Sequence, residues 1–279
     1  MMTRRQFHLL GAAPLMAAPP KLRIGVMDAS LRLGGKLEAV SFAAKLGFEG
    51  IQVSIGRPSG GKLPLSSSQL QASYLAAARQ HNIALTSTYL DVLHVNCLKN
   101  NKSDPLASRW VMDGIEITRN LKCRVLMIVF FGKCALDLRG EIDAVTDALK
   151  DLAPEAERAG VVLGFENTLS ARDNMYILDK VGSNALQVYY DVGNSTNMGG
   201  FDAPWEIRNL ERKRICQVHL KDKGYMGEGK VNFPEVMRAL AEIGYDGFGV
   251  LETSTVSGSV EEDMRRNLAY TRKLLAEVK

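Results

Sequence analysis

Four side chains that commonly bind metal ions stand where we expect four successive strands to end. They are Glu166, Asp191, His219 and Glu252, and each follows a short apolar run. Three carboxylates and one imidazole suit Mn²⁺, Mg²⁺, Co²⁺ or Zn²⁺. Taken singly, such a carboxylate is commonly a helix cap or half of an ion pair, and such a histidine a core residue. One ligand type at each of four consecutive strand ends favours a single site for one divalent metal ion.

The elements that would carry these residues are eight apolar segments. They are rich in Val, Ile, Leu and Phe and lack polar alternation, which is typical of strands buried on both faces of a parallel sheet. We expect these strands at residues 22–27, 50–55, 84–90, 123–131, 161–166, 186–191, 215–221 and 248–252.

Amphipathic segments between the strands carry signals of helix boundaries. Residues 38–46 and 141–159 have helical spacing, and each run is followed by a glycine, a common C-terminal signal. A further helix is expected at 233–243. The last helix opens at Ser259, with Glu262 three residues on, as in a capping box. Alternating strands and helices over residues 21–279 predict an α/β fold, a single (β/α)₈ TIM barrel whose strand ends face one shared pocket.

The composition excludes several classes of protein. Hydrophobic residues make up 46% and charged residues 24% of the chain, the balance of a globular protein with a full core. The net charge is +4, without a basic block or an aromatic-plus-arginine stripe, so we expect no nucleic-acid partner. No apolar run approaches the roughly 20 residues of a membrane span. The four cysteines show no C-x-x-C spacing, and we expect them to be small buried side chains: Cys97, Cys123, Cys134 and Cys216.

Residues 1–20 have the features of a processing segment. The pair Arg4-Arg5 precedes Gln6-Phe7 and a weakly apolar run, which resembles a twin-arginine export signal. We therefore expect a periplasmic protein without membrane contact once the signal is removed, or a cytoplasmic one if this interpretation fails. The twin-arginine route carries folded proteins, which suits loading of a metal before export and does not require disulfides.

Five short segments, taken in order, carry a resemblance to a known family. They are G-F-E-N, Y-Y-D-V-G-N, V-H-L-K-D, G-E-G-K-V-N-F and V-L-E-T, and they lie between Gly164 and Thr253. The chain resembles the xylose-isomerase-like superfamily of sugar isomerases and epimerases. Within it, the chain is most similar to ketose 3-epimerases, including pentulose-5-phosphate 3-epimerases, and the H-x-K-D piece is also similar to inosose dehydratases.

The resemblance implies a mechanism for the four strand-end residues. Together they would bind one divalent metal ion, which would hold a sugar carbonyl and the neighbouring hydroxyl. Glu166 and Glu252 would flank the carbon between those groups and act as catalytic acid and base. A cation stabilises the enediolate that forms when a proton α to a carbonyl leaves. Two carboxylates on opposite faces then allow removal from one side and return on the other, which is epimerisation.

Substrate contacts are expected from Asn194, Lys221, Glu228 and His94. Lys221 follows His219 by two positions, so it shares that side of the strand, and His94 lies just beyond the third strand. Asn194 stands where free-sugar 3-epimerases tend to have a histidine, and it fits the sugar-phosphate branch, as does the G-E-G tract around Glu228. An exported protein would rarely meet sugar phosphates, so these observations leave the substrate open.

Two further positions depart from the free-sugar enzymes. Tyr225 stands where they have an arginine six residues after the strand-seven histidine, and Gln52 stands where the second strand often ends in a glutamate. The sugar contacts of this chain are therefore expected to differ from theirs.

The leading functional hypothesis is a metal-dependent sugar isomerase or epimerase, of the ketose 3-epimerase type, with a small-molecule sugar substrate and possible homo-oligomers. One alternative is a keto-sugar or keto-inositol dehydratase or lyase, or a glycoside-cleaving enzyme, that uses the same enediolate. Another is a non-catalytic periplasmic sugar-binding barrel, which would not need two opposed bases. DNA-repair nucleases of the same fold need several more histidines than the four present.

Overall fold

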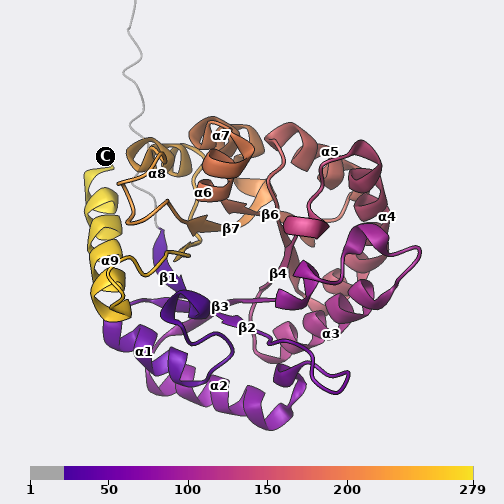
Figure 1. The fold of residues 1–279 in the computed structure, drawn as a ribbon, viewed down its shortest axis with the longest axis horizontal. Coiled ribbons are helices and arrows are strands. Elements are labelled where there is room, and N and C mark those ends of the chain that lie inside the picture. The colour runs from indigo at the N-terminus through magenta and orange to yellow at the C-terminus, as the bar shows by residue number, and fades with distance from the viewer. Residues whose placement is uncertain (1–21, 279) are drawn as a thin grey trace, which may run out of the picture.

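The computed structural model describes residues 22–278, so the expected export signal at residues 1–20 lies outside the described part. Eight parallel strands close into a barrel in the order β1 to β8, because β1 pairs with β8 as well as with β2. Figure 1 looks along this barrel, with the strands at the centre and the helices in a ring around them. The predicted (β/α)₈ barrel is confirmed.

Each strand lies within the segment expected from the sequence. The expected segments are longer than the observed strands by at most two residues at either end. The strands are β1 Arg23–Met27, β2 Gly50–Ser54, β3 Ala84–Tyr89, β4 Val125–Val129, β5 Val162–Glu166, β6 Leu186–Asp191, β7 Ile215–Leu220 and β8 Phe248–Leu251. Every residue of β2, β4 and β5 is buried. The absence of polar alternation thus reflects strands covered by the barrel interior on one face and by helices on the other.

The helices pack their apolar faces onto the barrel. They are α1 Glu38–Leu46, α2 Ser68–Gln80, α3 Leu106–Asn120, α4 Arg139–Ala159, α5 Ala171–Val181, α6 Val192–Asn194, α7 Ala203–Arg214, α8 Phe233–Glu242 and α9 Val260–Glu277. Ser259 caps α9 as expected, because its Oγ accepts a hydrogen bond from the backbone N–H of Glu262 at 3.4 Å. Short helical turns in the loops are η1 Asp28–Leu31, η2 Pro64–Ser66, η3 Asp91–His94, η4 Leu98–Asn100, η5 Gly132–Cys134 and η6 Ser195–Gly199. Within residues 22–278 no helix is both long and apolar enough to cross a membrane.

The structure corrects the expectation for the cysteines. Cys97 and Cys134 form a disulfide, whereas Cys123 is a buried free thiol and Cys216 is free and only partly buried. The bonded pair is 37 residues apart in sequence. The two cysteines lie in the loops that follow β3 and β4, and these loops meet because the strands are neighbours in the barrel. Because only the barrel topology brings these two cysteines together, no short Cys–Cys spacing in the sequence indicates the bond.

Candidate metal centre and substrate pocket

The four predicted metal ligands converge at the carboxyl end of the barrel. Glu166 is the last residue of β5, Asp191 the last of β6, His219 the last but one of β7, and Glu252 directly follows β8. The strand register places Asp191 level with His219. One donor atom from each of the four residues lies within 4.8 Å of the others. Residues spread over 87 positions of sequence are therefore gathered at one point by four successive strands.

His219 lies at the centre of the cluster. Its Nδ1 is 3.1 Å from Oε1 of Glu166, 3.2 Å from Oε2 of Glu252 and 3.8 Å from Oδ2 of Asp191. Its Nε2 is 2.9 Å from the side-chain oxygen of Gln52. An amide oxygen only accepts hydrogen bonds, so Nε2 carries a proton and Nδ1 faces the three carboxylates.

The electrostatics of the cluster favour a positive charge at its centre. Burial alone lowers the pKa of His219, but the carboxylates of Glu166 and Glu252 outweigh it and raise that pKa to about 10. Burial also raises the pKa of Asp191 well above its ordinary value, and repulsion from Glu252 adds to the rise. For Glu252, burial favours a higher pKa, yet His219 outweighs it and the pKa is lowered. A proton on His219 takes the place that a cation would fill.

Asp191 provides the test of whether a metal ion fits. Its Oδ1 accepts a hydrogen bond from the backbone N–H of Asn194 at 2.8 Å. Its Oδ2 is buried and accepts no hydrogen bond from any residue that the structure describes. Lys221 Nζ and His219 Nδ1 approach this oxygen only to 3.6 and 3.8 Å. A buried carboxylate oxygen that accepts no hydrogen bond is costly unless a cation meets it. Together with the carboxylates of Glu166 and Glu252 and the imidazole nitrogen of His219, this oxygen makes a donor set that fits a divalent cation.

Two of the expected substrate contacts lie against the cluster. Lys221 Nζ is 3.0 Å from Oε2 of Glu252 and 3.6 Å from Oδ2 of Asp191. Burial lowers the pKa of Lys221, but Asp191 and Glu252 outweigh it and raise the pKa, so the ammonium stays charged. Asn194 donates from Nδ2 to Oε1 of Glu166 at 3.4 Å.

Gly193 explains how Asn194 reaches the cluster. A Cβ at Gly193 would lie 2.7 Å from the backbone oxygen of Lys221, closer than side-chain carbons are found. Only glycine lets α6 pack this tightly on the end of β7. The D-V-G-N motif thus holds a candidate metal ligand and a pocket residue in one short turn.

A cavity of about 250 Å³ opens beside the cluster. Apolar and polar side chains share its walls: Met27, Tyr89, Leu90, Asp91, His94, Met127, Val129, Phe131, Glu166, Asn194, Met198, Lys221 and Glu252. The volume lies just below the range typical of small-molecule sites. Two of the four candidate metal ligands, Glu166 and Glu252, thus line a cavity that can hold a small polar ligand.

A buried carboxylate, Asp28, supports another part of the cavity wall. Asp28 accepts hydrogen bonds from the hydroxyl of Tyr89 at 2.7 Å and from the backbone N–H groups of Gly35 and Ser54, both at 2.9 Å. Burial outweighs these hydrogen bonds and raises the pKa of Asp28 to about 6. Ser54 in turn donates from Oγ to Asp91 at 2.8 Å. The network fixes Tyr89 and Asp91, which both line the cavity.

The structure does not bring Glu228 to the pocket, so its expected substrate contact is not supported. Its side chain is exposed and pairs with Arg266 on α9. The cause lies in the loop between β7 and α8, where the carboxylate of Asp222 accepts hydrogen bonds from the backbone N–H groups of Gly229 and Lys230, both at 3.1 Å. These bonds fold the loop back on itself. His94, in contrast, lines the cavity as expected.

Sequence reasoning missed several residues of the site. Asp91 is the second residue after β3, so the strand-end rule that selected the metal ligands could have found it. The sequence marks Gln52 only as a departure from the family pattern, which does not predict its contact with His219. Phe131 and Tyr89 lay in segments expected to be buried strand, and no signal separates a pocket aromatic from a core aromatic there.

A family model described as the xylose isomerase-like TIM barrel matches residues 40–274. Among curated proteins, the chain is 28% identical over 204 residues to the 2-epi-5-epi-valiolone 7-phosphate 2-epimerase of an Actinoplanes species, covering 72% of each chain. It is 27% identical over 177 residues to the L-ribulose 3-epimerase of Mesorhizobium japonicum, covering 58% of this chain and 59% of that one. A match of 26% over 156 residues to an uncharacterized Methanocaldococcus jannaschii protein covers 49% of this chain and 52% of that one.

Solved structures share the fold over nearly the whole chain. A D-psicose 3-epimerase crystallised with D-fructose superposes with a TM-score of 0.77 at 16% identity, covering 91% of this chain and 99% of that one. An L-ribulose 3-epimerase gives a TM-score of 0.74 at 18% identity, covering 92% of this chain and 95% of that one. At these identities the likeness establishes a common fold.

Proposed function

We propose that this chain, which belongs to the xylose isomerase-like TIM barrel family, is a divalent-metal-dependent sugar epimerase or isomerase of the ketose 3-epimerase type. The observation that carries the proposal is the convergence of Glu166, Asp191, His219 and Glu252 on one point, with a buried oxygen of Asp191 that accepts no hydrogen bond from the described residues. Two curated relatives that are named as epimerases support it.

The four converging residues would hold the ion, Mn²⁺, Mg²⁺, Co²⁺ or Zn²⁺ by their donor types. When bound, the ion would supply Lewis-acid stabilisation of the negative charge that develops on the sugar oxygens as a carbon-bound proton leaves. Gln52, bonded to Nε2 of His219, keeps the ring in the tautomer that presents Nδ1 to the cluster.

Glu166 and Glu252 are the candidates for moving the proton. They come from β5 and β8, with β6 and β7 between them, and both line the cavity. The charged ammonium of Lys221, 3.0 Å from Oε2, favours the carboxylate form of Glu252, as a general base requires. One carboxylate takes the proton from the carbon, and the other returns a proton from the opposite side, so the configuration inverts. Lys221, Asn194 and His94 would orient the sugar hydroxyls.

The test is proton exchange in D₂O with a panel of free ketoses, ketose phosphates and keto-glycosides. The metal-stripped protein and the protein supplied with each candidate metal are compared by NMR of the products. We expect deuterium at one sugar carbon together with the second epimer, only when metal is present. Glu262→Gln, on the exposed surface of α9, is the matched control for Glu252→Gln and should keep full activity.

Other outcomes of this experiment would replace the proposal. Release of water or of an aglycone would identify a lyase or a glycoside-cleaving enzyme that uses the same enediolate. Binding of a sugar without exchange of any carbon-bound proton would identify a sugar-binding barrel.

We also propose that the protein acts in the periplasm after twin-arginine export. The Arg4-Arg5 pair supports this location. The Cys97–Cys134 disulfide supports it as well, because disulfides persist in oxidising compartments. Replacing both arginines with lysine should hold the protein in the cytoplasm, as measured by fractionation. A doubly substituted protein that still reaches the periplasm would exclude this route.

A further inference from the structure

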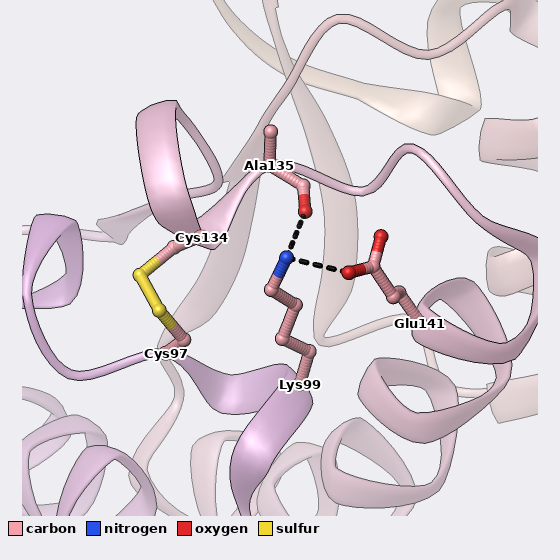
Figure 2. Close-up of a disulfide and its surroundings, with 5 residues drawn as sticks. All are labelled: Cys97, Lys99, Cys134, Ala135 and Glu141. Atoms are coloured by element: carbon pink, nitrogen blue, oxygen red, sulfur yellow. Dashed lines mark hydrogen bonds and ion pairs between the residues drawn. A yellow bond between two sulfur atoms is a disulfide. The ribbon is translucent and has the colours of Figure 1, made fainter.

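The disulfide joins the two loops at one side of the pocket mouth. Cys97 lies between η3 and η4 in the loop after β3, and Cys134 is the last residue of η5 in the loop after β4. Figure 2 shows the bond bridging the two loops. Both cysteines are buried, 7% and 1% exposed, so the bond is shielded from solvent reductants.

The disulfide is one tie between these loops, and Lys99 makes a second. Lys99 Nζ donates to the backbone oxygen of Ala135 and to Oε1 of Glu141, both at 2.7 Å (Figure 2). The other carboxylate oxygen of Glu141 accepts the backbone N–H groups of Asp137 and Leu138 at 2.9 and 3.0 Å. Lys99 therefore fastens the first loop to the start of α4.

The ties lie close to two residues that line the pocket. Cys97 is three positions after His94, and Cys134 is three positions after Phe131. The rings of His94 and Phe131 stack on each other, with centroids 6.2 Å apart and planes 29° apart. The disulfide thus holds together the two chain segments that present this ring pair to the cavity.

These loops would otherwise have much conformational freedom. The first runs from residue 90 to residue 105 between β3 and α3, which is long for a barrel connection. The His94 side chain is solvent-exposed, so packing alone does not fix it. Ordering such a segment only when a ligand binds weakens affinity, whereas a segment ordered beforehand avoids that loss.

We propose that the Cys97–Cys134 disulfide and Lys99 are positioning elements that hold His94 and Phe131 as the substrate-facing wall of the pocket. This inference rests on the proposed function for the nature of the ligand, a small sugar. The four candidate metal ligands come from the ends of β5 to β8, whereas the disulfide and Lys99 join the loops after β3 and β4 through Cys134, Ala135 and Glu141, none of which is a candidate ligand. Loss of the tie should therefore weaken substrate binding and leave the proton-transfer step intact.

The kinetic test removes the ties one at a time. In Cys97→Ser/Cys134→Ser, KM for the best sugar found should rise on the order of tenfold, with kcat changed less than about twofold. Lys99→Met keeps the disulfide and should raise KM by a smaller factor. The controls are Cys216→Ser, a free cysteine, and Lys102→Met, whose exposed side chain lies in the same loop. Neither should change KM.

A double-mutant cycle shows whether the tie acts through the ring pair. In a His94→Ala/Phe131→Ala background, removal of the disulfide should add little further rise in KM, because the wall that it positions is gone. Full additivity of the two effects would overturn the proposed coupling.

Two measurements are independent of catalysis. Protein unfolded without reductant should expose two alkylatable thiols out of the chain's four cysteines. Amide hydrogen exchange in residues 90–105 and 130–138 should speed up in the double serine variant and, to a lesser degree, in Lys99→Met. Four free thiols, unchanged exchange, or a lower kcat at constant KM would each contradict the proposal. A parent protein without turnover would instead count against the proposed function. The thiol and exchange measurements would then still show whether the disulfide and Lys99 order the two loops.

Discussion

Nε2 of His219 lies 2.9 Å from the side-chain oxygen of Gln52, and both side chains are wholly buried. The amide nitrogen of Gln52 donates to Sδ of Met127 at 3.4 Å, which turns the amide oxygen toward the histidine. The imidazole proton is thereby kept on Nε2, and Nδ1 is presented to the carboxylates. Gln52 selects the nitrogen of His219 that would bind a metal ion.

Removing the acceptor from Gln52 should weaken metal binding. Gln52→Leu keeps a similar volume but leaves the N–H of His219 unpaired, and we expect the affinity to fall about 10–100-fold. Competition with a coloured chelator measures the affinity. Gln71→Leu is the control, because Gln71 is also a buried amide but bonds to the backbone of Leu65 far from the cluster. Equal affinities for Gln52→Leu and the parent would show that Gln52 does not orient His219.

Metal binding should release protons at neutral pH. The pKa of His219 in the metal-free protein is about 10, because Glu166 and Glu252 outweigh the effect of burial. A cation must displace the proton from Nδ1, so the apparent affinity should rise about tenfold per pH unit below pH 10. Calorimetry at pH 7 in buffers of different ionisation enthalpy should report at least one proton released per metal ion. Binding without proton release would mean that His219 is neutral before the metal arrives.

Asp28 should make the protein less stable as the pH rises. Its pKa is raised from 3.8 to about 6, mainly by burial, so the folded state binds more protons than the unfolded state between these values. The stability due to this group is therefore full below pH 3.8 and falls as the pH rises through 6, by about 3 kcal/mol.

Comparison with Asp28→Asn isolates this effect. The neutral amide can still accept from the backbone N–H groups of Gly35 and Ser54. The free energy of unfolding of the variant, relative to the parent, should therefore increase by roughly 3 kcal/mol between pH 3.8 and pH 6. Urea titrations across this range measure it, and a constant difference would show that Asp28 titrates normally.

The cluster of candidate metal ligands could be predicted from the sequence for a physical reason. In a parallel barrel all strands point the same way, so a residue that ends one strand lies beside the residue that ends the next. Locating β5 to β8 was then enough to bring Glu166, Asp191, His219 and Glu252 together. Glycine and serine signals placed the helix ends at Gly47 and Ser259 because these caps act within one turn.

What escaped prediction depends on how the loops fold. Glu228 was expected at the pocket, but hydrogen bonds to Asp222 turn its loop toward α9. The Cys97–Cys134 disulfide forms between loops that are distant in sequence and adjacent only through the barrel. Strand ends follow from the fold class, whereas loop paths follow from individual side-chain contacts.

The most direct measurement compares deuterium uptake by Glu166→Gln and Glu252→Gln. Each change keeps one oxygen ligand and removes one proton-carrying carboxylate, so metal affinity should fall only in part. Turnover should fall at least about 10²–10⁴-fold, as is usual when one acid or base is lost. With the best sugar in D₂O, we expect the two variants to exchange the carbon-bound proton of opposite epimers. Near-normal turnover in both variants would contradict a role for either glutamate in moving the proton.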